Sequence, residues 1–182
     1  MGTWAFETYA DGEDASTAFN TARSDAAFEH GHGGYSGTIA EKDSYVVITY
    51  TITDLDEAER LAGTLMENDD PRIADKWGPA GAIPVRQPTR TVRVDDLTGS
   101  GTSYLLDPAE LDRITGIART RGLITPGETV TAGHLITATR NRAGRRPGYT
   151  GGVAELTVRR SPADLQAQTR PDGWLFFGLA SC

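Results

Sequence analysis

Two histidines and two carboxylates lie close together in the segment EHGHGGYSGTIAEK, which begins at Glu29. Imidazole nitrogens and carboxylate oxygens bind divalent metals such as zinc, so His30 and His32, with Glu29 or Glu41, form a candidate metal site. The chain has only one other histidine, His134, and no HExxH spacing. The alternative interpretation places both imidazoles at the end of a helix, where they can bond its free carbonyl groups.

The same segment contains the glycine run GHGGYSGT, whose backbone N–H groups could converge on an anion. Phosphate loops precede a helix, so that the positive helix N-terminus meets the charge. Here the expected helix comes first, ends at Gly31, and turns its negative end toward the loop. We therefore predict a turn rather than a phosphate loop, and we place a candidate ligand site at Tyr35, Ser36, Thr38 and Trp77.

The densest positive cluster is RNRAGRR, which contains Arg140, Arg142, Arg145 and Arg146. Such a cluster can bind the phosphates of a nucleic acid in a salt-dependent way. Residues 131–142 fit a helix or a strand, and we interpret them as a helix, which together with the helix before it would resemble a winged helix. The competing interpretation is that these arginines neutralise an acidic body.

The charge is divided unevenly over the 182 residues, whose formal net charge is −7. Residues 1–85 hold 16 acidic and 5 basic side chains, whereas residues 86–160 hold 7 acidic and 12 basic ones. This division indicates either internal ion pairing or a separate surface for an anionic partner.

Composition predicts an ordered cytoplasmic chain. Hydrophobic residues make up 38% and charged residues 24%, which is typical of globular proteins. No basic start followed by an apolar run is present, and no apolar stretch of about 18 residues occurs, so we expect neither secretion nor a membrane span. The single cysteine, Cys182, excludes an internal disulfide and suits a reducing compartment.

Several elements must position the candidate side chains. Helical spacing of apolar residues predicts helices after a cap at Asp14 or Ser16, from Asp54, and from Asp107 to Gly122. Aromatic and β-branched residues predict strands at 3–9, 76–86, 89–97, 153–160 and 173–181.

Residues 36–52 are predicted to form a β-hairpin of two short strands that turn at residues 41–44, with Val46, Ile48 and Tyr50 on one face. Proline lacks the N–H group that a sheet ladder needs, so Pro79 and Pro84 place the strand that contains them near an edge or limit its ends.

This order predicts an α+β fold with a mostly antiparallel sheet and two to four helices. We expect a single domain over residues 1–182. Its core would comprise residues 1–85 and 173–182, residues 86–160 would form an arginine-bearing insertion of helix and loop, and residues 161–172 would connect the two.

Three segments carry a family resemblance: EHGHGGYSGTIAEK, DKWGPAGAIPVR and GWLFFGLAS. Their patterns, GHxGYxGTI, KWGP and a closing FFG-type strand, resemble small uncharacterised proteins of actinobacteria and bacteriophages. The match covers mostly residues 1–85 and 173–182. The resemblance implies a shared core and a phage-encoded or phage-related accessory role.

We therefore expect a non-catalytic binding or accessory protein without a cofactor, located in the cytoplasm, or in the host cytoplasm if phage-encoded. It would present the glycine-rich loop and the arginine-rich insertion to a protein or nucleic-acid partner. Two alternatives stay open. One is a hydrolase in which His30 and His32 hold a divalent metal that activates water, and the other is a virion or assembly component.

Overall fold

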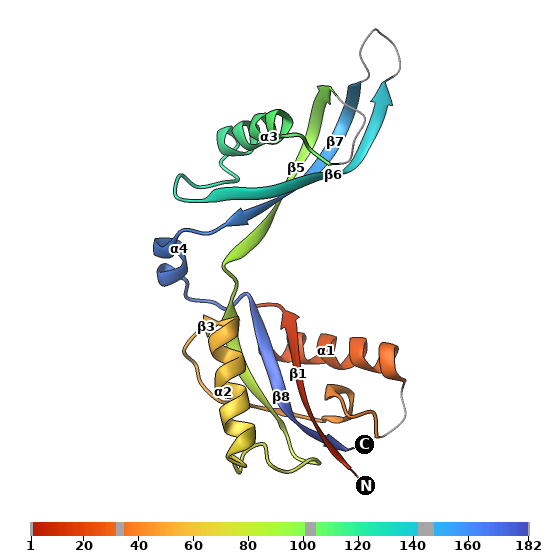
Figure 1. The fold of residues 1–182 in the computed structure, drawn as a ribbon, viewed down its shortest axis with the longest axis vertical. Helices are drawn as coiled ribbons and strands as arrows, with labels where there is room; N and C mark the ends of the chain where they lie inside the picture. Colours follow the sequence, from red (N-terminus) through yellow and green to blue (C-terminus); the bar gives the residue numbers. More distant parts are fainter. Residues whose placement is uncertain (1, 32–34, 101–104, 142–147, 182) are drawn as a thin grey trace. The chain divides into compact units, whose positions relative to one another are not determined.

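The chain folds into two compact units (Figure 1). The computed structural model describes residues 2–31, 35–100, 105–141 and 148–181. The first unit comprises residues 1–87 and 168–182, and the second comprises residues 88–167. Over the described residues, helices and mostly antiparallel strands give an α+β fold, as predicted. The sequence-based division into core, insertion and connecting segment stays a prediction beside these contact-based units.

The first unit is built on a sheet in which the first and last strands of the chain are neighbours. β1 (Thr3–Asp11) pairs with β8 (Gly173–Ser181) antiparallel over its whole length. On its other side β8 pairs antiparallel with β4 (Ala80–Arg86). Two short strands, β2 (Tyr45–Val47) and β3 (Thr53–Asp54), both run parallel to β4 along its outer edge.

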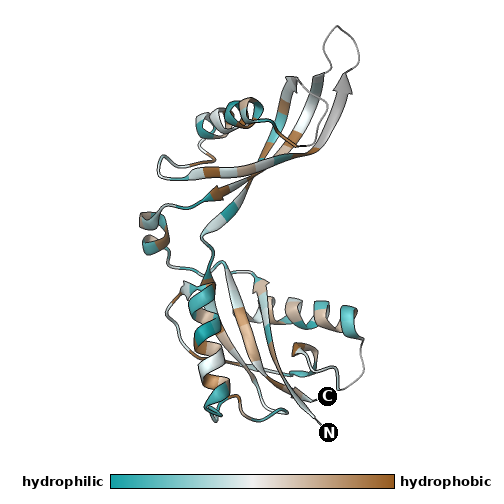
Figure 2. Cartoon of the chain, viewed as in Figure 1, coloured by the Kyte–Doolittle hydropathy of each residue, from teal (hydrophilic) through white to brown (hydrophobic). Residues whose placement is uncertain are grey.

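Helices cover both faces of this sheet. Side chains alternate across a strand, so Phe176 of β8 packs with Phe19 of α1 (Ala15–His30), while Phe177 packs on the other face with Ala58 of α2 (Leu55–Glu67). The short 3₁₀ helix η1 (Ile39–Glu41) lies on the α1 face, with Ile39 fully buried. Figure 2 shows hydrophilic and hydrophobic residues interleaved along α1 and α2, as expected for helices that each cover one face.

The predicted first helix is confirmed, and its ends have the expected chemistry. The Asp14 side chain accepts a hydrogen bond from the Thr17 N–H group at the N-terminus. At the other end, Gly31 has φ 89° and donates its N–H to the Ala27 carbonyl. The segment after His30 therefore begins at the negative, carbonyl end of α1.

The predicted β-hairpin over residues 36–52 is wrong. Residues 39–41 form η1, and the two short strands observed, β2 within this range and β3 just after it, each pair with β4. Tyr50 does not share a buried face with Ile48, contrary to the prediction: the Tyr50 side chain is 87% exposed, whereas Ile48 packs in the core. Each short strand is stabilised by a partner more than thirty residues further along the chain, which local patterns do not reveal.

Of the two predicted effects of Pro79 and Pro84, the edge position is wrong, since β4 lies inside the sheet, whereas the limit on the strand's ends is confirmed by Pro79, which directly precedes β4. Ala80 N–H donates to the Ser44 carbonyl and Ile48 N–H donates to the Ala82 carbonyl, so the even-numbered residues of β4 face β2. Pro84 is next in this series and has no N–H to offer. The ladder to β2 stops there, and pairing resumes only where β3 meets Val85.

The second unit is a three-stranded antiparallel sheet covered on one face by a helix. Its strand order is β5 (Thr89–Ser100), β7 (Gly148–Arg159), β6 (Thr129–Asn141), and α3 (Pro108–Thr120) packs through Ile114 on the buried face. A short helix, α4 (Pro162–Ala167), follows β7. None of the described helices of either unit is long and apolar enough to cross a membrane.

The predicted helix over residues 131–142 is wrong, and the winged-helix interpretation is wrong with it. Residues 131–141 belong to β6, which pairs with β7 along its length, and residue 142 lies outside the described residues. Their threonines, Val130 and Ile136 favour the pleated conformation, in which β-branched side chains pack well. Leu135 faces the core from this strand.

One packing contact depends on the absence of a side chain. A Cβ atom at Gly81 would lie 2.5 Å from two ring atoms of Phe177, which is fully buried. We expect Gly81→Ala to lower the free energy of unfolding by about 1–3 kcal/mol, because the ring must shift in a close-packed core. Urea denaturation measures this change.

Gly63→Ala is the matched control. Gly63 lies within α2 and its Cβ would meet no atom within 4 Å, so the same substitution should stabilise the protein by up to about 1 kcal/mol. Equal stabilities of Gly81→Ala and the unsubstituted protein would contradict the packing described for β4 and β8.

Candidate functional site

The three segments that carry the family resemblance meet at one end of the first unit. The rings of Tyr35 and Trp77 approach edge to face, with centroids 6.2 Å apart and planes at 83°. The Glu41 carboxylate accepts hydrogen bonds from the N–H and hydroxyl groups of Ser181, the last residue of β8. Tyr35 and Trp77, predicted separately from the sequence, are thus brought together.

These two aromatic rings are exposed. Tyr35 is 54% and Trp77 61% accessible to solvent, and the Lys76 ammonium lies 5.4 Å from the centroid of the Trp77 ring. Edge-to-face and cation–π contacts of this kind favour particular orientations of the rings. We call Tyr35, Lys76 and Trp77 the aromatic corner.

Glu41 fixes the loop that carries Tyr35. Its Oε1 accepts hydrogen bonds from Gly37 N–H at 2.8 Å and from the Ser36 hydroxyl at 3.1 Å. Its Oε2 accepts from Ser181 N–H at 3.1 Å and from the Ser181 hydroxyl at 2.6 Å. Four donors therefore tie the loop to the end of β8.

Ser36 and Thr38, predicted as ligand-binding residues, make internal hydrogen bonds. Their hydroxyl oxygens lie 2.9 Å apart, and Thr38 Oγ1 accepts a hydrogen bond from Ala40 N–H at the start of η1. Both side chains thus shape the turn that holds Tyr35.

Lys42 fixes the segment that carries Trp77. Its ammonium donates to the carbonyl groups of Lys76 at 2.9 Å, Gly78 at 3.0 Å and Asp75 at 3.4 Å. An ammonium has three N–H donors, so these carbonyls match its full capacity. The side chain is 1% exposed, and the residues on both sides of Trp77 are therefore anchored to a buried cation.

Sequence reasoning did not identify Lys42 or the anchoring role of Glu41. One signal was available, because Lys42 is one of only two lysines among 18 basic residues. Three convergent carbonyl groups suit a compact ammonium better than a planar guanidinium. The partner carbonyls, however, come from more than thirty residues away and leave no local pattern.

The protonation of both anchors follows from their surroundings. Burial raises the pKa of Glu41, but the hydrogen bonds from Ser181, Gly37 and Ser36 together outweigh it, so its pKa lies below the usual value. Burial lowers the pKa of Lys42, and the carboxylates of Asp75 and Glu41 oppose this effect. The carboxylate oxygens of Glu41 and the N–H donors of Lys42 are all occupied by hydrogen-bond partners within the protein.

The candidate metal ligands that the structure describes, Glu29, His30 and Glu41, lie in surroundings that differ from one another. His30 ends α1, and its Nε2 lies 3.9 Å from Oε2 of Glu29, with both side chains exposed. His32 lies outside the described residues, while Glu41 is bonded to four donors. Within the described ranges, no three His, Cys, Asp or Glu side chains gather in a way that could hold a metal ion. The metal site stays a prediction.

The predicted arginine-rich contact falls largely outside the described residues, which exclude Arg142, Arg145 and Arg146. Arg140 belongs to β6, where its backbone is paired with Tyr149. Other arginines of the second unit make internal contacts, among them the Arg90–Glu128 ion pair at 2.6 Å. That pair supports internal neutralisation for at least part of the positive charge.

No protein-family model, curated protein or solved structure matches this chain. The resemblance to actinobacterial and bacteriophage proteins therefore stays a prediction. A function for the chain is inferred below from the contacts of its own residues.

The Glu41 anchor has a testable pH dependence. We expect Glu41→Gln to lower the free energy of unfolding at pH 7 by about 1–3 kcal/mol, because an amide cannot accept all four hydrogen bonds. The pKa of Glu41 is lower in the folded than in the unfolded chain. Its stabilisation is therefore complete above the unfolded value, near 4.5, and is lost as the pH falls through the folded pKa.

Urea denaturation of both proteins between pH 7 and pH 3 measures this, and the two stabilities should converge in acid. Glu67→Gln is the control, since Glu67 is an exposed residue at the end of α2 and should change stability by less than about 0.5 kcal/mol. A difference between Glu41→Gln and the unsubstituted protein that stays constant with pH would exclude the anchoring role of the charge.

Proposed function

We propose that this chain is a non-catalytic cytoplasmic binding protein that captures a protein partner through the aromatic corner. The observation that carries the proposal is an exposed Tyr35–Trp77 pair whose backbone segments are anchored by the buried Lys42 and the partly buried Glu41. Tyrosine and tryptophan dominate the binding energy of many protein interfaces. An aromatic residue on an anchored backbone loses less conformational entropy when a partner binds than one on a free loop.

The backbone of Tyr35 supports this proposal. Its φ is 74°, in the left-handed region that non-glycine residues rarely adopt. Such a conformation costs about 1–2 kcal/mol per residue and persists only where the surrounding structure imposes it. Glu41 supplies that constraint through Gly37 and Ser36, and the result is an outward-facing ring.

A third aromatic side chain enlarges the surface at this end of the sheet. Trp4 is 65% exposed and lies opposite Ala180 in the register of β1 and β8, one residue from Ser181. Large exposed aromatic residues at one end of a unit are typical of an interaction surface. We include Trp4 in the surface that meets the partner.

The polar groups of this site favour binding over catalysis. The Glu41 carboxylate is occupied by four internal donors, and the Lys42 ammonium is buried against three carbonyl groups. A general acid or base needs a proton that it can exchange with a substrate. These two groups instead hold the rings in position.

The family resemblance supports a phage-related accessory role for this binding protein. The arginine-rich segment from Arg140 to Arg146 would supply a contact of the second unit with a partner. A virion or assembly component is one alternative, which would sediment with particles from the source, and a metal-dependent hydrolase that uses His30 and His32 is the other.

The rings can be removed without disturbing the core. We expect Trp77→Ala, alone or with Tyr35→Ala, to weaken capture of the partner at least tenfold, because each deletes an exposed ring at the proposed centre of contact. Affinity capture from the source extract, followed by mass spectrometry and then titration of the recovered protein, measures this.

Tyr50→Ala is the matched control, because Tyr50 is an exposed aromatic residue outside the corner. It should leave capture unchanged, and all variants should keep their melting temperatures. Equal capture by Trp77→Ala and Tyr50→Ala would refute the proposal. Recovery of nucleic acid in place of a protein, lost on nuclease treatment, would also refute it.

A further inference from the structure

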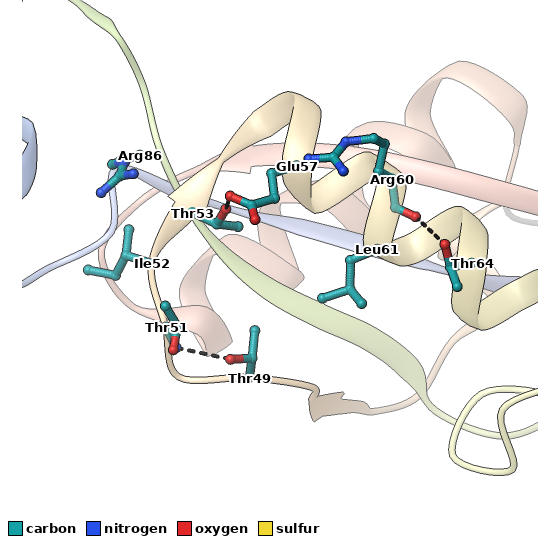
Figure 3. A pocket seen from close by; sticks show the side chains of 9 residues that line it. All are labelled: Thr49, Thr51, Ile52, Thr53, Glu57, Arg60, Leu61, Thr64 and Arg86. Atoms are coloured by element: carbon teal, nitrogen blue, oxygen red, sulfur yellow. Dashed lines mark hydrogen bonds between the residues drawn. The ribbon is translucent and has the colours of Figure 1, made fainter.

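An open pocket of about 560 Å³ lies between α2 and the segment that joins β2 to β3 (Figure 3). Pockets of this size accommodate small organic ligands. Its existence follows from the sheet: the ladder from β4 to β2 stops at Pro84, so the chain leaves the edge and returns only at Thr53. The residues that bridge this gap, including Thr49 and Thr51, form one wall.

The charge in this pocket differs from that of the unit around it. Residues 1–87 and 168–182 hold 17 acidic and 7 basic side chains. Two of the basic ones, Arg60 and Arg86, line the pocket together with one carboxylate, Glu57. Asp54 pairs with Arg86 at 2.7 Å, so the charges at the pocket balance within a unit that is acidic as a whole.

Arg60 differs from the other arginines of the first unit. Each of the others makes an ion pair, namely Arg23–Asp43, Arg72–Asp70, Arg86–Asp54 and Arg170–Glu13. The Arg60 guanidinium makes no ion pair or hydrogen bond with any residue that the structure describes, although Asp56 and Glu57 lie one turn before it on α2. An arginine left unpaired in acidic surroundings is available to an external anion.

Hydroxyl groups complement this cation. Thr51 N–H donates to Thr49 Oγ1 at 3.1 Å, which leaves the Thr49 hydroxyl hydrogen free to donate. The Thr53 hydroxyl donates to the Glu57 carboxylate and so holds that negative group on its own side of the pocket. Figure 3 shows Thr49 and Thr51 on the segment across the pocket from α2, and the Arg60 side chain running along α2 toward Glu57.

We propose that this pocket binds a small oxyanion, a phosphate ester or a carboxylate, with the Arg60 guanidinium as its charged anchor and the hydroxyls of Thr49 and Thr51 as further donors. Guanidinium groups bind carboxylate and phosphate oxygens through paired, charge-assisted hydrogen bonds. Leu61 and Ile52 also line the pocket and suit a ligand with a short apolar portion. The proposal is independent of the aromatic corner.

The test is an NMR titration of the full chain with inorganic phosphate and, separately, with succinate, at an ionic strength held constant with sodium chloride. We expect one anion to shift the amide signals of Thr49, Thr51 and Thr64 in a saturable way. Saturation by phosphate alone assigns the phosphate-ester class, and saturation by succinate alone assigns the carboxylate class.

Substitutions identify the anchor. Arg60→Gln should weaken the saturable binding about tenfold or more, and Arg60→Lys should restore part of it. Arg72→Gln removes an arginine that pairs with Asp70 outside the pocket, and it should leave the titration unchanged. Failure of both anions to saturate the signals would overturn the proposal, as would equal affinities of Arg60→Gln and the unsubstituted protein.

Discussion

The buried ammonium of Lys42 and the neighbouring carboxylate of Glu41 determine how one end of the first unit is built. A charge removed from water is tolerated only when its hydrogen-bonding capacity is met inside the protein. Lys42 meets this condition through the carbonyls around Trp77, and Glu41 meets it through the loop after Tyr35 and the end of β8. Three segments distant in sequence are therefore placed together by two adjacent residues.

The absence of an N–H group at Pro84 is a second local feature that affects a wide part of the first unit. A proline inside a sheet interrupts one ladder, and here the interrupted ladder is the one to β2. The edge beside β4 is consequently split into two short strands, and the segment between them forms a wall of the pocket that contains Arg60. Backbone chemistry at a single position thus creates a cavity that side-chain patterns do not predict.

Local signals in the sequence predicted α1, α2 and α3, but not the short α4. Asp14 and Asp107 cap α1 and α3 through side-chain hydrogen bonds with residues three positions later, so their patterns are complete within a few residues. The closing strand, β8, was predicted with its observed bounds, since its apolar run is buried on both faces. Residues 36–52 were misread because β2 pairs with β4, a strand distant in sequence, and residues 131–141 were misread although their β-branched side chains favour the strand that β7 pairs with. In the site, Tyr35 and Trp77 were recognisable by type, whereas their contact and the role of Lys42 depend on tertiary structure.

The central position of β8 has a consequence for synthesis of the chain. β8 separates β1 from β4, yet its residues leave the ribosome after the whole of the second unit. The second unit is continuous in sequence and can complete its sheet as it emerges, since domains generally fold as units during translation. Until residues 173–181 have been synthesised, the sheet of the amino-terminal half lacks the strand that separates β1 from β4. During that interval its apolar surface is exposed and can bind chaperones or aggregate.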